Sequence, residues 1–551
     1  MTPSAEQTPR VSSDAAQFDK PRDLTVTLFW LLIGLTLLPI WSAHYFPSQD
    51  GPAHVYNALI LRDWHRPQGG IFRHYFELNA DPEPNLLGHW IMAGLMFVLP
   101  GWVVEKLLIS VYIVALPLST RYAVRGVSRE SSFIAFLSFP LVYSLALHKG
   151  LYNFCLSLPL FFYFVGYWLR RDGRFDARGM AILLALSLLL YFAHVVSLLE
   201  AYVTGGILAL ALSGLDEMRR RRGVPAIPPL RRLILSRAVF PLLALAPTLC
   251  LVVYFFRRQH GAEETGVQDP VHMLRELLNL STLISYRMSE RHCSRCIMLL
   301  FAVLTLFGLW RICIQKVRTR NDVLLFPLAA SLALYFLTPN SAAGGGLISP
   351  RLMLYCYFLL ILWLACTPYP IWAQRAVQGA AALLCVWMLA TYAVRYHQFN
   401  VYLRDFAECA PFIEPNSTVL PICLSDRGYG PSGAELSIRH GARLFLHAFD
   451  NVAVKRNLVD LSNYEATQGY FPTLFRPDVT PEGRIGEFGQ GLLDYPRLTG
   501  DRGRIDYVLI WDVREKDDAQ KLGEVTQALD RAYDLIHTSP RHFLRLYRLK
   551  S

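Results

Sequence analysis

The sequence predicts a polytopic α-helical membrane protein, with about 11 transmembrane helices and a C-terminal α/β domain. The chain has 551 residues, of which 53% are hydrophobic and only 18% are charged, whereas soluble proteins average about 25% charged residues. Apolar stretches recur between residues 24 and 394, and from residue 395 the composition is that of a soluble domain. We therefore predict a cytoplasmic tail (1–23), a membrane domain (24–394) and an extracytoplasmic domain (395–551).

Each apolar stretch has about 17 to 20 residues, enough for a helix that crosses the hydrocarbon core of a bilayer. The first is not a cleavable signal, because it is too long, lacks a small-residue cleavage site and is followed by aromatic residues. The predicted spans are 24–43, 103–120, 131–147, 151–169, 179–195, 198–214, 237–256, 296–314, 322–338, 351–367 and 376–394.

Arginine-rich loops set the predicted orientation. They follow the second, fourth, sixth and eighth spans, so all of them share one side of the membrane with the N-terminus. The positive-inside rule makes that side the cytoplasm and predicts a multi-pass protein of the inner membrane. These loops also account for the net charge of +11 without a nucleic-acid partner. The loops 44–102, 257–295 and 339–350 then lie outside, together with the C-terminal domain.

The apolar run 86–99 is too short to span a bilayer at about 14 residues, and it predicts a helix lying in the outer interface. If this segment crossed the membrane, every later basic loop would face outward, against the positive-inside rule.

Asp50 and His54 lie just beyond the first span, in the segment Pro-Ser-Gln-Asp-Gly-Pro-Ala-His. Asp50 suits a helix N-cap with Pro52 in the first turn, which places His54 one turn along on the same face. A carboxylate at this depth can act as a general base toward an acceptor. The alternative is a helix cap beside an incidental surface histidine. One Asp and one His are too few to predict a metal site.

Other polar residues gather at the outer ends of spans. His148, Lys149 and Asn153 either hold a phosphate or form a tight turn anchored at the headgroups, and His194 closes the next outer turn. Arginine forks match phosphate oxygens, and Arg258 and Arg351 both lie at outer ends. The alternative for each arginine is snorkelling to lipid headgroups. Ionisable residues are nearly absent within the spans, which disfavours an ion-coupled transporter.

The C-terminal part alternates strand and helix patterns typical of an α/β domain. A long loop rich in Gly, Pro and aromatic residues interrupts it, and this loop either covers a membrane cavity or is a passive surface. The predicted elements are strands at 417–422, 505–511 and 542–549, a helix at 518–537 and the loop at 469–500.

Among the ten cysteines, two pairs could form disulfides on the outer side. Cys293 and Cys296 form a lone CxxC pair, for which zinc binding or redox activity is the alternative. Cys409 and Cys423 lie in the C-terminal domain. The sequence leaves both pairings open.

The layout resembles the GT-C superfamily of glycosyltransferases, which includes protein O-mannosyltransferases and aminoarabinose transferases. Asp50 stands where that family has a catalytic acid after the first span, and the segment Pro-Asn-Leu-Leu-Gly-His-Trp at 84–90 resembles the start of its interfacial helix. The resemblance implies a sugar on polyprenyl phosphate as the donor. Many members have two adjacent acids here, but Gly51 takes the second place. The second outer loop has no Asp-x-Asp, so a divalent metal is not expected.

The combined prediction is an inverting, metal-independent glycosyltransferase without a cofactor, which transfers a sugar from a polyprenyl-phosphate donor to a glycan, lipid or protein acceptor. Asp50 would be the general base, and His54 would orient it or bind the acceptor. The donor phosphate would meet Arg351, assisted by Lys149 or Arg258. The remaining predicted substrate-binding residues are His148, Asn153 and His194. The alternatives are a non-catalytic envelope protein that presents its C-terminal domain to a partner and a translocase of lipid-linked saccharides.

Overall fold

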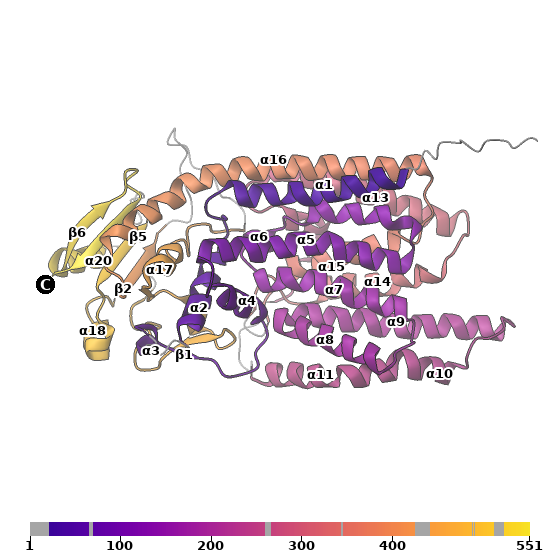
Figure 1. Cartoon of the computed structure of the whole chain (residues 1–551), viewed down its shortest axis with the longest axis horizontal. Helices are drawn as coiled ribbons and strands as arrows, with labels where there is room; N and C mark the ends of the chain where they lie inside the picture. Colours follow the sequence, from indigo (N-terminus) through magenta and orange to yellow (C-terminus); the bar gives the residue numbers. More distant parts are fainter. Residues whose placement is uncertain are drawn as a thin grey trace, which may run out of the picture.

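The computed structural model describes residues 21–64, 70–258, 266–342, 345–424, 441–486, 489, 491–511 and 523–550. Its long helices form an elongated bundle with a β-sheet at one end (Figure 1). We call this the sheet end and the opposite end of the bundle the basic end. Most of the predicted tail, 1–20, lies outside the described residues.

Every predicted span coincides with a helical segment. Nine described segments are long and apolar enough to cross a bilayer, and two shorter apolar helices, α8 and α15, complete a set of eleven. The protein is therefore a multi-pass membrane protein. The segments are α1 (Pro21–Ser42), α5 (Gly101–Val127), η1 (Glu130–Leu141) with α6 (Leu145–His148), α7 (Tyr152–Arg171), α8 (Ala177–Ala193), α9 (Val195–Arg221), α10 (Leu230–Ile234) with η2 (Leu235–Val239) and α11 (Phe240–Arg258), η4 (Met288–Glu290) with α13 (Arg291–Cys313), η5 (Arg320–Leu324) with α14 (Leu325–Leu337), α15 (Ile348–Leu364) and α16 (Ile371–Cys409).

The basic loops meet at one end, as the orientation argument requires. Arg320 Nη2 lies 2.9 Å from a carboxylate oxygen of Asp172 and 2.9 Å from one of Asp216. Arg237 Nη2 lies 2.8 Å from the same Asp216. This network joins the end of α7, the end of α9, η2 and the start of η5, so three of the four predicted basic loops share one side of the bundle.

The loop 44–102 folds into short elements at the sheet end. These are α2 (Gly51–Trp64), α3 (Phe72–Tyr75), β1 (Phe76–Leu78) and α4 (Leu87–Leu95). The predicted interfacial helix corresponds to α4, whose 9 residues are too few to cross a bilayer. Figure 1 shows α2 and α4 between the bundle and the C-terminal sheet. The next outer loop contains α12 (Pro270–Leu278) and η3 (Ser281–Leu283).

The C-terminal part is built on a five-stranded mixed sheet in the order β3-β2-β5-β7-β6. Strand β2 (Thr418–Cys423) runs parallel to β3 (Val459–Asp460) and β5 (Tyr507–Trp511), and β7 (Leu544–Leu549) is antiparallel to β5 and β6. The three predicted strands are confirmed. Its other elements are η6 (Ala410–Phe412), α17 (Asp450–Arg456), η7 (Tyr464–Thr467), β4 (Thr473–Phe475), α18 (Tyr495–Thr499) and η8 (Gly500–Gly503).

The predicted helix at 518–537 is wrong in its second half. Helix α20 (Gly523–Ala532) ends where β6 (Tyr533–Thr538) begins, and β6 pairs with β7 from Tyr533–Leu549 to Thr538–Arg545. Pairing with the free edge of β7 satisfies backbone groups that a longer helix would leave on that strand. Residues 518–522 lie outside the described part of the chain.

Two features fix the C-terminal part to the bundle. Helix α16 continues for 39 residues, so the predicted boundary at 394/395 falls inside one helix. The Phe406 ring of α16 stacks on Trp511 of β5, with ring centroids 4.2 Å apart. Strand β1 of the loop 44–102 also pairs antiparallel with β4, Phe76 opposite Phe475. The outer loop and the C-terminal part therefore fold as one unit.

Neither of the two disulfides that the sequence left open is present, because Cys293, Cys296 and Cys409 are all free thiols. Cys409 Sγ lies 3.0 Å from the Phe406 carbonyl oxygen of its own helix.

Candidate active site at the sheet end

The backbone around Asp50 is held by the turn between η1 and α7. The N–H groups of Gln49 and Asp50 donate to the carbonyl oxygens of His148 and Lys149 at 3.0 and 3.1 Å. Gly150 permits this contact, because a Cβ at that position would lie 2.5 Å from the Gly51 nitrogen. Asp50 immediately precedes α2, and its carbonyl accepts the His54 N–H at 3.1 Å. The predicted helix start is thus confirmed.

The Asp50 carboxylate lies among polar groups from both halves of the molecule. Its Oδ1 accepts a 2.9 Å hydrogen bond from Gln49 Nε2 and lies 3.7 Å from His447 Nε2 of the C-terminal part. Gln49 Oε1 in turn accepts from Lys149 Nζ and from the Arg443 backbone N–H, both at 2.8 Å. Lys149 is therefore linked to Asp50 through Gln49, whereas the sequence predicted it to assist Arg351 at the donor phosphate.

His447 is a buried, neutral neighbour of Asp50. Burial lowers the pKa of His447, and the charge of Asp50 opposes that effect only in part. Its ring lies against Tyr464, with centroids 4.6 Å apart. A neutral imidazole beside the Asp50 carboxylate does not form a full ion pair with it.

His54 points away from Asp50 toward two other buried side chains. Its Nδ1 lies 2.5 Å from Glu465 Oε1, and His89 Nε2 lies 3.0 Å from Glu465 Oε2. Burial alone would raise the pKa of the Glu465 carboxyl, but the charges and hydrogen bonds of His54 and His89 lower it to about 2. Glu465 is therefore a buried carboxylate that ties α2 and α4 to η7 of the C-terminal part.

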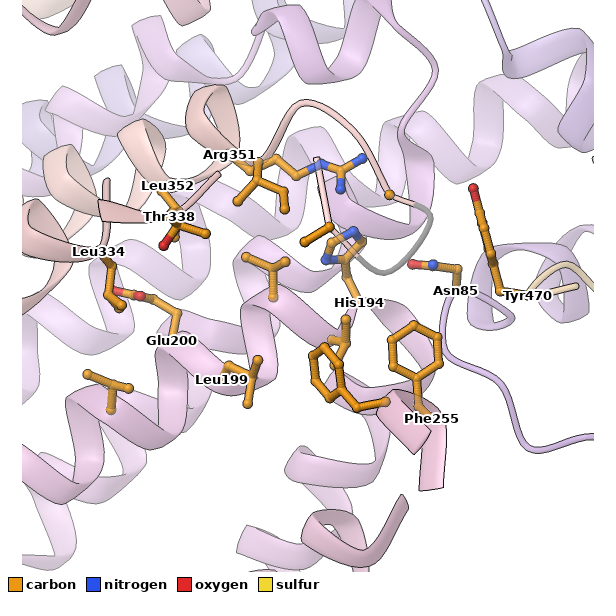
Figure 2. A pocket seen from close by; sticks show the side chains of 17 residues that line it. Asn85, His194, Leu199, Glu200, Phe255, Leu334, Thr338, Arg351, Leu352 and Tyr470 are labelled. Atoms are coloured by element: carbon orange, nitrogen blue, oxygen red, sulfur yellow. The ribbon is translucent and has the colours of Figure 1, made fainter. Parts of the chain in front are cut away.

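A cavity of about 400 Å³ opens beside this cluster, between α9, α11, α14 and α15. In the view of Figure 2, Arg351 and His194 lie near its middle, Glu200 lies beside Leu334 and Thr338, and Asn85 and Tyr470 lie on the opposite side. Its walls are mostly apolar, with side chains such as Val196, Leu199, Phe255, Phe256, Leu334 and Leu352. Such a lining suits a lipid tail.

Arg351 is the cation of this cavity. Its guanidinium lies over the Phe154 ring, 5.5 Å from the centroid, and its buried Nε has no hydrogen-bond partner. Within the part of the chain that the structure describes, no carboxylate is within ion-pair distance of Arg351. A partly buried cation without a counter-charge is costly, and an anionic ligand would remove that cost.

Tyr470 connects the cavity with Asp50. It comes from the predicted long loop at 469–500 and lines the cavity. Burial raises the pKa of Tyr470 to about 12, the charge of Arg351 acts to lower it, and the charges of Glu465 and Asp50 act to raise it. The charges of Asp50, Glu465 and Arg351 thus all act on this one phenol.

Three predicted binding residues have structural roles instead. Both ring nitrogens of buried His148 are used by Ser285 Oγ and Tyr396 Oη, at 2.7 and 2.6 Å. The Asn153 side chain anchors the start of α4, accepting from the Gly88 N–H at 2.6 Å and donating to the Asn85 carbonyl at 2.5 Å. Neither side chain has a free polar atom for a phosphate.

Arg258 is the third of these residues, and its contacts are with acidic side chains of the loop 44–102. Its guanidinium pairs with Asp81 and lies 3.0 Å from Glu83 Oε1, so it fastens the loop 44–102 to the end of α11. Two carboxylates already compensate its charge, and it does not line the cavity.

The comparisons with known proteins show the fold. No family model matches the chain, and no curated protein matches it in sequence. The crystal structure of ArnT from Cupriavidus metallidurans bound to undecaprenyl phosphate matches with a TM-score of 0.54 at 10% identity, over 96% of this chain and 98% of ArnT. The chain therefore has a fold like that of ArnT. The Archaeoglobus fulgidus oligosaccharyltransferase, tethered with an acceptor peptide, matches with a TM-score of 0.44 at 10% identity, over 96% of this chain and 74% of that chain.

The structure shows what occupies the space beside Asp50, where the sequence has Gly51. A Cβ at Gly51 would lie 2.1 Å from both Ser48 Oγ and Tyr152 Oη. These two hydroxyls are 2.8 Å apart, and the Tyr152 hydroxyl donates to buried Glu105 at 2.6 Å. The space beside Asp50 is therefore filled. The nearest acid named here is Glu105 of α5, which accepts a hydrogen bond from the Tyr152 hydroxyl.

Sequence reasoning missed the partners that the C-terminal part contributes, namely His447, Glu465 and Tyr470. They lie about 400 residues from Asp50 along the chain and belong to no local motif. The only sequence signal was the aromatic loop at 469–500, which was considered as a cover for the cavity.

Proposed function

We propose that this protein is an inverting glycosyltransferase that uses a sugar on polyprenyl phosphate as donor. One observation carries the proposal: Arg351 is a partly buried cation with no carboxylate partner among the described residues, in a largely apolar cavity that Tyr470 also lines. The likeness in fold to ArnT, a protein solved with undecaprenyl phosphate, supports a lipid phosphate as the ligand.

In this proposal, the donor binds with its lipid against the apolar walls and its phosphate against Arg351. The guanidinium matches two phosphate oxygens at once, in hydrogen bonds strengthened by opposite charge. His194 stands on the same side of the cavity, and Tyr470 and Asn85 lie toward the acceptor side. The sugar is then held between Arg351 and Asp50.

Asp50 acts as the general base in the transfer step. It takes the proton of the acceptor hydroxyl while that oxygen bonds to the anomeric carbon, and the bond from this carbon to the phosphate oxygen breaks. Polyprenyl phosphate leaves with the bonding pair, and Arg351 stabilises the charge that develops on it. Attack from the face opposite the phosphate inverts the anomeric centre. Gln49, Lys149 and His447 position the carboxylate.

In this mechanism Arg351 holds the phosphate, so no metal ion is needed to bridge the phosphate to acidic residues. No other cofactor takes part in the reaction.

We also propose that the sheet end is extracytoplasmic and the basic end cytoplasmic, in the inner membrane, because the arginine-rich loops gather at the basic end. The acceptor, a glycan, lipid or protein, would approach from the side of the C-terminal part.

The function is tested by profiling lipid-linked saccharides and glycans in cells that carry the wild-type chain, the Asp50→Asn variant or no chain. The proposal predicts that one glycan loses a sugar without the chain and that Asp50→Asn reproduces this loss at normal protein level. A non-catalytic envelope protein or a translocase would tolerate Asp50→Asn, and a wild-type profile in that variant contradicts the proposal.

A further inference from the structure

His54, His89 and Glu465 converge on one point between the membrane domain and the C-terminal part. They come from α2, α4 and η7, and one ligand atom from each lies within 4.8 Å of the other two. All three side chains are at most 6% exposed. Two imidazoles and one carboxylate are a donor set that recurs in zinc sites.

The outer nitrogens of both imidazoles face backbone carbonyls. His89 Nδ1 lies 3.2 Å from the Asn85 carbonyl oxygen and 3.4 Å from Asn153 Nδ2, and the Gly150 backbone lies within hydrogen-bonding reach of the His54 ring. A carbonyl oxygen only accepts hydrogen bonds, so the carbonyl contacts favour the tautomer in which each outer nitrogen carries its hydrogen. In the neutral ring, the inner nitrogen then presents a lone pair.

The inner nitrogens, His54 Nδ1 and His89 Nε2, both face the Glu465 carboxylate at 2.5 and 3.0 Å. Lone pairs on both sides of a carboxylate repel it, and one metal ion among the three groups would accept both lone pairs and the carboxylate charge. Protons are the alternative: they lie either on both rings, which leaves two cations with ring centroids 5.0 Å apart, or on His54 alone, with the His89 hydrogen on Nε2.

We propose that this cluster binds one divalent transition-metal ion of the Zn²⁺ type. Nitrogen and carboxylate donors suit that ion, and ligand atoms around tetrahedral Zn²⁺ are about 3.3 Å apart, close to the separations found here. The carbonyls of Asn85 and Gly150 would fix the tautomer and direction of each imidazole, as partners of metal-bound histidines commonly do. Phe471 closes the site, with ring centroids 6.1 and 6.0 Å from those of His54 and His89.

The ion would hold the candidate active site together. His54 lies one turn after Asp50, Asn85 lines the cavity, and Glu465 lies in the segment that also places Tyr464 and Tyr470. An ion bound by Glu465, by His54 of α2 and by His89 of α4 would hold the C-terminal part over the cavity. This is a positioning role, and it does not rest on the proposed transfer reaction.

The test is the metal content of the full chain, purified in detergent without chelator and measured by mass spectrometry. The proposal predicts about one Zn²⁺ per chain, near zero in His89→Gln and Glu465→Gln, and no change in the exposed control His272→Gln. Asp50→Asn should keep the ion, so failure of the transferase proposal leaves this result unchanged.

A second measurement guards against variants that fail to fold. Stripping the wild-type chain with chelator should lower its melting temperature, and adding Zn²⁺ back should restore it. Co²⁺ added instead should show the visible absorption of a tetrahedral complex. A wild-type chain that holds no ion and ignores chelator overturns the proposal in favour of a protonated cluster. Metal retained equally in both ligand variants also overturns it, because the ion then lies elsewhere.

Discussion

The two ends of the bundle carry their charges in different ways. At the basic end, Arg237, Arg320 and Arg311 each contact a carboxylate, and buried Arg311 pairs with Asp322. At the sheet end, Arg351 has no carboxylate partner among the described residues. The Asp50 carboxylate contacts the neutral side chains of Gln49 and His447. Paired charges hold helices together, whereas unpaired charges cost folding energy and are retained where a ligand compensates them. Under the proposed function, this comparison separates arginines that hold helices together from an arginine that binds a ligand.

The largest expected effect comes from Asp50. Asp50→Asn keeps the size and the Gln49 contact but removes the proton acceptor, so transfer should fall by about 10²-fold or more. Sugar incorporation into the native acceptor, measured at matched protein level, checks this. Asp81→Asn is the matched control, since that outer-loop acid pairs with Arg258. Equal loss in both variants would place the effect on folding of the loop.

At the basic end, removing one member of a pair should affect stability alone. Asp322→Asn leaves the 2% exposed Arg311 side chain without its counter-charge, which costs about 3 kcal/mol for a buried pair. Thermal unfolding in detergent measures the loss, and binding of undecaprenyl phosphate below the melting temperature should stay normal. Loss of lipid binding with unchanged stability would reverse the assignment of the two ends.

Arg351→Gln should show the opposite pattern. Loss of a charge-assisted phosphate contact should weaken binding of undecaprenyl phosphate about tenfold or more, while the melting temperature without lipid stays the same or rises. Native mass spectrometry of the purified chain measures the binding. Arg258→Gln, a sheet-end arginine already paired with two acids, should bind like wild type. Equal weakening in both variants would remove the distinction between paired and unpaired arginines.

A smaller effect is expected from a buried acid pair in the C-terminal part. Burial, followed by the charge of Asp460, raises the pKa of Asp450 well above its usual value. A raised folded-state pKa stabilises the fold below the unfolded value of 3.8, and that stability is lost as the pH rises through the folded value. Asp450→Asn should therefore raise stability at pH 8 by roughly 1 kcal/mol and flatten its pH dependence. Melting curves across pH measure this, and a lower stability than wild type at pH 8 would contradict it.

The sequence alone predicted the membrane domain well, because apolar length and arginine placement are local properties of each segment. Helical segments coincide with all eleven predicted spans, nine of them long and apolar enough to cross a bilayer, and the three predicted strands are confirmed. The roles of Asp50, Lys149, His194 and Arg351 stay predictions. The prediction was wrong where contacts between residues far apart in the sequence determine the role of a side chain. His148, Asn153 and Arg258 have the right residue types, but Tyr396, Asn85 and Asp81 occupy their polar atoms. Glu465 and His447 reach the site only through the fold of the C-terminal part, which no local pattern shows.

The central claim is that the sheet end contains a lipid-phosphate site shared by Arg351 and Asp50. A cryo-electron microscopy structure of the chain in nanodiscs with undecaprenyl phosphate tests it most directly. We predict that the phosphate contacts the Arg351 guanidinium and that the isoprenoid tail follows the apolar walls between α9, α11 and α14. A phosphate bound among the arginines of the basic end, with the Arg351 cavity empty, would contradict the account.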